Sequence, residues 1–145
     1  ARALAEKIYE SADMEQKKSF KPKLYDGTFE KLVELKKVGF KLGIATNGVT
    51  KITKEMLAGL GLGDVFSVVV GADLVDRSKP APDMIILACE KIGVSLTACV
   101  YFGDQYTDMA AANEAGALSV GVRNHDLAEK GAEETISLVK DIVAG

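Results

Sequence analysis

Six residues have the side chains and the spacing that a site for a phosphate group and a divalent cation needs. The segment Thr46-Asn47-Gly48 offers a hydroxyl and the backbone N–H groups of a turn, which together can bind an anion. Lys79 offers a positive charge. Asp104 and Asp108 lie four residues apart, so on a helix their carboxylates can face one divalent cation. Phosphoryl transfer requires little more than such positioning and charge neutralisation, together with a nucleophile.

Each of these features alone also has a simple structural explanation. A Thr-Asn-Gly segment is a common turn, a lysine before a proline is usually solvated, and Gly-Asp often only ends a strand. By the same reasoning Asp73 is a loop residue, Asp83 is a first-turn carboxylate that the helix dipole favours, and His125 lies on the surface. The phosphate interpretation is preferred because the candidates occur in this order, each at the end of a predicted strand.

Short apolar segments rich in β-branched residues alternate with helical patterns, which is typical of βαβ units and a parallel sheet. Strands are predicted over Lys41–Thr46, Val65–Val70, Ala98–Phe102 and Ser119–Val122. Helices are predicted over about Arg2–Phe20, Thr28–Val38, Thr50–Leu60, Pro82–Ile92, Thr107–Ala115 and Glu133–Val143, with Thr50 as an N-cap. In an open sheet of this kind ligands bind outside the carboxyl ends of the strands, which is where the six candidates occur.

Composition and charge exclude several other classes of protein. The chain has 145 residues, 48% of them hydrophobic, which suits one domain with its own core. With a net charge of -3 and basic residues that occur singly or in pairs, the sequence has no nucleic-acid footprint and no membrane anchor. Cys89 and Cys99 lack metal-ligand spacing and are interpreted as core residues in a reducing cytoplasm. The expectation is a cytoplasmic globular enzyme or binding domain.

Three segments resemble signature motifs of the haloacid dehalogenase-like (HAD) superfamily, in its branch of phosphoglycolate phosphatases and β-phosphoglucomutases. LGIATNG, from Leu42 to Gly48, resembles the second motif of that family. SKPAPD, from Ser78 to Asp83, resembles the third motif, and VYFGDQYTDMAAANEAGA, from Val100 to Ala117, resembles the fourth. The resemblance runs from about Lys23 to Val122 in order and spacing.

The resemblance implies a role for each candidate residue. Thr46 would hydrogen-bond the transferring phosphoryl group, with Asn47 and Gly48 in the same phosphate-binding turn. Lys79 would stabilise the charge of the phosphoryl group and of the nucleophile, so Thr46 and Lys79 are the expected catalytic residues. The expected cofactor is Mg²⁺. Its site residues are Asp104, which would bind the metal, and Asp108, which would support either the water shell of the metal or Lys79.

The sequence departs from the family at the first motif, DxDGT, which supplies the aspartate nucleophile and an acid/base aspartate. The only similar segment is Asp26-Gly27-Thr28, and Leu24 stands where the first carboxylate would be. The preceding residues, KKSFKPKLY, do not have the pattern of a buried strand. Asp26 is therefore interpreted as a turn and helix-cap residue rather than as the nucleophile.

This departure changes the expected architecture, which is an α/β three-layer sandwich with a mostly parallel, Rossmannoid sheet. In the family the missing first strand is central, between the strands that end at Thr46 and at Asp104. Residues 1–22 are then a remnant of a helical cap and a linker, and residues 23–145 form a HAD-like core without its first strand. The sheet would be completed by direct pairing of the strands that end at Thr46 and at Asp104, by a strand-swapped homodimer, or by a separate N-terminal segment.

The leading functional hypothesis is a Mg²⁺-dependent hydrolase of a small phosphorylated metabolite, acting through an aspartyl-phosphate. Without the nucleophile segment the chain alone is expected to be inactive. The alternative is a catalytically inactive HAD-like module for binding or assembly. A phosphoacceptor receiver domain fits poorly, because receivers carry their acidic pair at the first strand and here the pair comes last. The sequence selects neither a substrate nor a phosphatase over a phosphomutase, since nearly all of the cap is missing.

Overall fold

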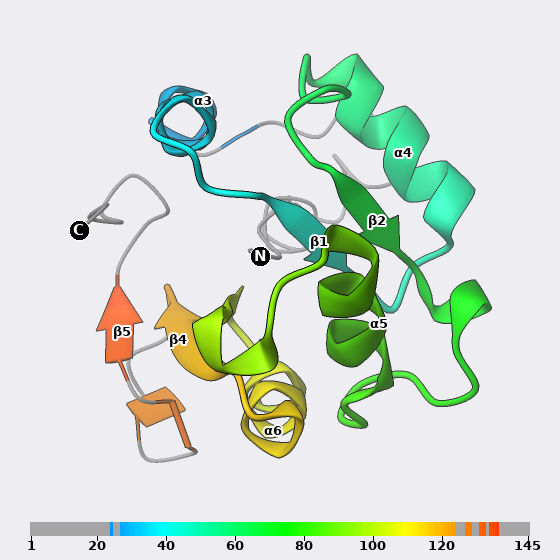
Figure 1. Cartoon of the computed structure of the whole chain (residues 1–145), viewed down its shortest axis with the longest axis vertical. Helices are drawn as coiled ribbons and strands as arrows, with labels where there is room; N and C mark the ends of the chain where they lie inside the picture. Colours follow the sequence, from blue (N-terminus) through cyan, green and yellow to red (C-terminus); the bar gives the residue numbers. More distant parts are fainter. Residues whose placement is uncertain (1–23, 25–26, 124–126, 129–130, 133, 137–145) are drawn as a thin grey trace.

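Figure 1 shows the fold of the chain in a computed structural model, which describes residues 24, 27–123, 127–128, 131–132 and 134–136. The predicted first helix and the whole of residues 1–22 lie outside the described residues. Asp26, His125 and the end of the predicted tail helix, from residue 137 onward, also lie outside them.

The described elements alternate between strands and helices along the chain, as the sequence predicts. The helices are α3 (Thr28–Lys37), α4 (Thr50–Gly59), α5 (Asp83–Ile92) and α6 (Tyr106–Ala115), with two short 3-10 helices, η1 (Ala72–Leu74) and η2 (Leu96–Ala98). The strands are β1 (Gly43–Ala45), β2 (Val68–Val70), β3 (Val100–Gly103), β4 (Leu118–Val122) and β5 (Glu134–Ile136). Every helix and strand predicted between residues 28 and 122 is present, with somewhat different bounds.

The predicted tail helix is wrong where it overlaps the described residues. Glu134–Ile136 form the strand β5, which pairs in parallel with β4 and sets Ile136 opposite Val122. Arg123 donates its backbone N–H to the Ile136 carbonyl over 2.9 Å. The edge of β4 offers hydrogen-bond partners to a neighbouring backbone, and β5 contains two β-branched residues, Thr135 and Ile136, which favour a strand.

The strands form two parallel ladders rather than one. β1 pairs with β2, and β4 lies between β3 and β5. Among the described residues no ladder joins β1 to β3. The expected central strand would lie between these two strands. The described sheet is therefore that of an α/β sandwich without its central first strand.

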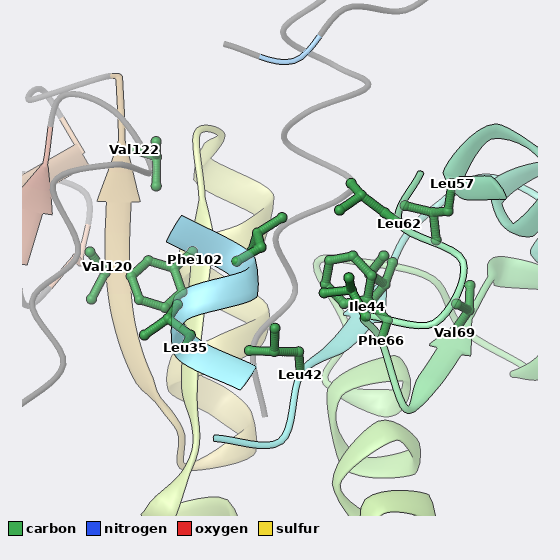
Figure 2. Packing of buried hydrophobic residues seen from close by; sticks show 12 residues of the cluster. Leu35, Leu42, Ile44, Leu57, Leu62, Phe66, Val69, Phe102, Val120 and Val122 are labelled. Atoms are coloured by element: carbon green, nitrogen blue, oxygen red, sulfur yellow. The ribbon is translucent and has the colours of Figure 1, made fainter. Parts of the chain in front are cut away.

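Alternate residues of each strand face opposite layers of helices, and this builds the three-layer sandwich. Ile44 of β1 and Phe102 of β3 belong to a core formed with α3 and α4. Their neighbours Ala45 and Tyr101 belong to a second core, formed with α5 and α6. Figure 2 shows the first core, in which Phe102 and Val120 lie near Leu35 of α3 on one side, Ile44 and Phe66 lie on the other, and Leu42 lies between the two groups. The two ladders thus share both cores.

Two of the helices end where the sequence predicts. α5 is followed by Gly93 with a φ of 81°, and α6 by Gly116 with a φ of 89°, a left-handed conformation that glycine adopts without strain. Each short helix therefore returns the chain to the amino end of the next strand. None of the helices in the described part of the chain is long and apolar enough to cross a membrane.

Candidate active site

The turn after β1, the candidate phosphate-binding segment, is fixed by Thr46. The Thr46 N–H donates to the Val70 carbonyl of β2 over 2.9 Å, and its Oγ1 accepts the N–H of Gly48 over 3.0 Å. Thr46 is only 7% exposed, whereas Asn47 and Gly48 are exposed. The buried threonine therefore shapes the turn, and the turn itself lies open at the carboxyl end of β1.

Lys79 is buried and forms an ion pair with Asp108. Its Nζ lies 2.6 Å from Asp108 Oδ1, and each of the two side chains is 1% exposed. The Nζ group also donates to the Tyr101 hydroxyl over 3.0 Å and lies 5.6 Å from the centroid of that ring. Lysine and aspartate are rarely buried unless they are paired, so this pair keeps a positive charge inside the protein.

One hydrogen bond joins Lys79 to the turn after β1, and another joins its partner Tyr101 to the last residue of β1. The backbone N–H of Lys79 donates to Asn47 Oδ1 over 3.1 Å. The Tyr101 hydroxyl, which accepts from Lys79, donates to the Ala45 carbonyl over 3.0 Å. These contacts connect β1, β3 and the loop before α5 at the carboxyl ends of the strands. The structure thus brings together the candidates Thr46, Asn47 and Lys79.

Asp108 lies against Lys79, in one of the two arrangements that the family resemblance implies. Its Oδ1 accepts from Lys79 and lies 3.4 Å from the Tyr101 hydroxyl, and its Oδ2 accepts the N–H of Gln105 over 3.1 Å. The second contact caps the first turn of α6. A Cβ atom at Gly103 would overlap the Asp108 side chain, so this close approach needs the glycine.

Asp104 follows β3 directly and is half-buried at the carboxyl end of the strand. The described residues contain no group of three or more His, Cys, Asp or Glu side chains that could hold a metal ion. Mg²⁺ ordinarily binds one or two carboxylates together with water and phosphate oxygens, and the carboxylate of Asp104 is of this type.

Asp73, interpreted from the sequence as a loop residue, caps α4. Its Oδ1 accepts the N–H of Thr50 over 2.7 Å and the Thr50 hydroxyl over 2.9 Å. The hydrogen bond from the Thr50 backbone and, to a smaller extent, the one from its hydroxyl lower the pKa of Asp73 because they stabilise its charged form.

The prediction of Thr50 as the N-cap is wrong, since Val49 occupies that position and Thr50 is the first helical residue. The Thr50 hydroxyl accepts the N–H of Gly71 over 2.8 Å and so joins the loop after β2 to α4.

The sequence pattern does not single out Tyr101 or Gln105, although both contact the ion pair of Lys79 and Asp108. A signal for Tyr101 exists, because a tyrosine within an apolar strand buries a hydroxyl that must find a partner. Gln105 lies three residues before Asp108, which is the spacing of a capping box. Both signals predict that the residue makes a hydrogen bond, but neither predicts that its partner is the ion pair of Lys79 and Asp108.

Comparison with known protein families shows to which family the chain belongs. Residues 2–122 match the haloacid dehalogenase-like hydrolase family. The chain belongs to that family. The three motifs that carry the resemblance lie within the matched range, so the expected HAD family and its α/β fold are confirmed.

The HAD-family chain is similar to phosphoglycolate phosphatases from two bacteria. It is 39% identical to the Neisseria meningitidis protein over 98 residues, which cover 68% of this chain and 42% of that protein. It is 38% identical to the Pectobacterium atrosepticum protein over 93 residues, which cover 64% and 40%. The match therefore spans about two fifths of the length of these relatives.

Among solved structures, a HAD phosphatase from Thermococcus onnurineus superposes on the chain with a TM-score of 0.77 and 31% sequence identity. The superposition covers 86% of this chain and 59% of that protein. Most of this chain therefore has the same α/β fold as part of a longer HAD-family protein.

Proposed function

We propose that this chain carries the phosphoryl-binding part of a phosphomonoester hydrolase that acts on a small phosphorylated metabolite. The observation that carries the proposal is the buried cluster of Lys79, Asp108 and Tyr101 beside the turn after β1. A positive charge held inside the protein, next to an open turn that contains the Thr46 hydroxyl and the exposed Asn47, suits a phosphoryl group. The phosphoglycolate phosphatases among the relatives support the same chemistry.

In the proposed reaction an aspartate carboxylate attacks phosphorus, the P–O bond to the leaving oxygen breaks, and that oxygen takes a proton from a general acid to leave as the alcohol. Water then hydrolyses the aspartyl-phosphate and releases inorganic phosphate. Lys79 stabilises the negative charge of the phosphoryl oxygens and of the carboxylate. The segment Thr46-Asn47-Gly48 binds and orients the phosphoryl group. Asp108 and Tyr101 are positioning residues, since they hold the Lys79 ammonium.

Mg²⁺ is the proposed cofactor, and Asp104 is its proposed ligand from the described part of the chain. When bound, the ion neutralises charge on the phosphoryl oxygens. Asp104 is suited to this role because it is a half-buried carboxylate at the end of β3. Asp108 is proposed to support the site through Lys79, which its carboxylate contacts at 2.6 Å.

The nucleophile is proposed to come from a strand that completes the sheet between β1 and β3. An N-terminal segment or a strand of a second copy would serve, since either brings a backbone to the two edges that face each other. Asp26 lies outside the described residues and is not assigned this role. The proposed compartment is the cytoplasm, because both cysteines are buried thiols rather than a disulfide.

Hydrolysis of small phosphomonoesters by the full-length protein, with Mg²⁺ present, tests the proposal. Lys79→Ala and Asp104→Asn are each expected to lower kcat/KM by roughly 10²–10⁴-fold, because each removes charge stabilisation in the transition state. The matched controls Lys91→Ala and Asp64→Asn change exposed side chains outside the site and should have little effect. Full activity in both site variants would refute the assignment.

The same assay separates an enzyme from a non-catalytic module. An inactive module would hydrolyse no phosphomonoester with or without Mg²⁺, while still binding inorganic phosphate at the turn after β1. Binding would then be lost in Lys79→Ala and retained in Lys91→Ala.

A further inference from the structure

The two cysteines of the chain lie in contact with each other. Cys89 is in the second half of α5, and Cys99 directly precedes β3. Their Sγ atoms are 2.9 Å apart, and the two residues are only 2% and 3% exposed. A disulfide S–S bond is about 2.05 Å long, so the two sulfurs need to approach by only about 1 Å to form one.

The surroundings of the pair permit this approach. The segment between the cysteines contains Gly93, in the left-handed conformation, and the exposed residues Ser95, Thr97 and Ala98. A surface segment of this kind can adjust without moving the strands of the sheet. Cys89 and Cys99 are also the only cysteines of the 145-residue sequence, so no other thiol of the same chain competes.

We propose that Cys89 and Cys99 are a modification site, at which a peroxide converts the two thiols to an intramolecular disulfide that ties α5 to β3. In the first step a cysteine sulfur attacks one oxygen of hydrogen peroxide. The O–O bond breaks, a sulfenic acid forms and one water leaves with the thiol proton. In the second step the other sulfur attacks the sulfenic sulfur, the S–S bond forms and the S–O bond breaks, so that a second water leaves. Two thiols lose two electrons, and the peroxide takes them up.

The reduced pair is the ordinary state of the protein. The contact with Cys99 raises the pKa of Cys89, and burial raises it further, so Cys89 remains a thiol at neutral pH. The thiolate is the reactive form of cysteine, and oxidation is therefore slow until the segment between the two cysteines opens. A small uncharged oxidant suits a buried pair better than a bulky disulfide reagent.

The disulfide would connect two segments that adjoin residues of the candidate site. α5 begins four residues after Lys79, and β3 contains Tyr101, whose hydroxyl contacts the Lys79 ammonium. Because the sulfurs are already in contact, the bond fixes this arrangement rather than disrupting it. The inference concerns the thiols alone and does not depend on the proposed hydrolase activity.

Mass spectrometry of the folded chain after treatment with hydrogen peroxide tests the proposal. The expected product has lost two hydrogens, a decrease of about 2 Da that dithiothreitol reverses. Trypsin cleavage without reduction should then give one cross-linked product, because Cys89 lies in the peptide Ser78–Lys91 and Cys99 in the peptide Ile92–Arg123. The oxidised chain should also melt at a temperature higher by about 4 °C or more, since the bond restricts the unfolded state.

Cys89→Ser and Cys99→Ser are the matched controls, and each should gain oxygen on its one remaining thiol without losing two hydrogens. The result for the unmodified chain stands even if a variant does not fold. Oxygen adducts on separate thiols, or disulfide-linked dimers in place of the internal cross-link, would overturn the proposal. Thiols that survive in the folded chain under conditions that oxidise the chain in urea would overturn it as well.

Discussion

At the scale of single residues, the buried ion pair of Lys79 and Asp108 is costly to form. Removing both charges from water has a large desolvation penalty. The 2.6 Å contact offsets it, together with the hydrogen bond that Lys79 donates to the Tyr101 hydroxyl and the one that the Gln105 N–H donates to Asp108. Apolar side chains of the same volume would fill the space at lower cost. Stability alone therefore does not account for the charges, and this supports the proposed phosphoryl site.

Lys79→Met should destabilise the protein by about 3–5 kcal/mol, because it leaves the Asp108 carboxylate buried without its cation. In the double variant Lys79→Met/Asp108→Leu the loss should be much smaller than the sum of the two single losses. Urea unfolding of the four proteins measures this coupling. The pair of Lys31 and Glu34 on the surface of α3 provides the control. Lys31 is half-buried there but its partner Glu34 is exposed, so Lys31→Met should cost less than about 1 kcal/mol. Additive losses at Lys79 and Asp108 would contradict the prediction.

Asp73 should contribute to stability in a pH-dependent way. Its pKa is lower in the folded protein than in the unfolded chain, because Thr50 donates two hydrogen bonds to the charged carboxylate. The contribution is therefore present above about pH 4 and is lost as the pH falls through the lowered pKa. Asp73→Asn should melt at a lower temperature than the unmodified protein at pH 7, with the difference shrinking toward pH 2.5. The exposed neighbour Asp76 offers the control Asp76→Asn, and an equal shift in both variants would contradict the prediction.

The residues of the candidate site were predictable from sequence to different degrees. Thr46 lies at the end of a predicted strand, directly before the turn residues Asn47 and Gly48, and such positions favour a ligand site. Lys79 precedes Pro80 in the loop that follows the next strand. The contact between Lys79 and Asp108 spans 29 residues, and no local pattern reports it. Tyr101 and Asp73 were not predictable as site and cap residues, since their roles depend on which loops the sheet brings together.

At the scale of elements, close backbone contacts fix the turn after β1 relative to the loop after β2. A Cβ atom at Gly71 would lie 2.5 Å from both the Gly48 carbonyl oxygen and the Thr50 nitrogen, which is much closer than real atoms approach. Ala72 also donates its N–H to the Gly48 carbonyl over 2.9 Å. The backbone of Gly71 is extended, a conformation that any residue adopts. Glycine is therefore needed at position 71 because of the close approach and not because of its backbone conformation.

Gly71→Ala should therefore destabilise the protein by about 1–3 kcal/mol, the usual cost of overpacking a well-packed contact. Gly59→Ala is the matched control. A Cβ atom there meets nothing within 4 Å, and Gly59 is the last residue of α4, so alanine should be neutral or stabilise by up to about 1 kcal/mol. Chemical denaturation of both variants measures the difference. Equal effects at the two positions would show that the Gly71 contact is not tight.

Element bounds show what hydrophobic patterns do and do not predict. The apolar segment Val65–Val70 predicts a strand of six residues, but only Val68–Val70 pairs with β1, while Val65 and Phe66 are buried without belonging to a ladder. Burial depends on hydrophobicity, whereas pairing depends on a neighbouring edge. For the same reason the pattern of the tail predicts a helix where β4 recruits Glu134–Ile136 as a strand.

At the scale of the whole molecule, the main question is how the two ladders are joined. Leu42 and Thr46 bond to Ser67 and Val70 on the side of β2. Because backbone groups of successive residues point to alternate sides of a strand, those of Ala45 point away from β2. The Ala45 carbonyl accepts the Tyr101 hydroxyl from β3 on that side. The Tyr101 side chain therefore contacts the Ala45 carbonyl, to which a central strand would donate a backbone N–H.

Amide hydrogen exchange at Ala45 should report whether a strand completes the sheet in solution. We expect the Ala45 amide to exchange about as slowly as the Thr46 amide, which donates to Val70 over 2.9 Å, because a central strand would protect it. Protection that increases with protein concentration would indicate a strand from a second copy, and protection independent of concentration would indicate a segment of the same chain. Exchange at Ala45 about 100-fold faster than at Thr46 at every concentration would mean that no strand occupies this position. The proposed nucleophile would then need another source, because the sheet edge that should carry it would be open.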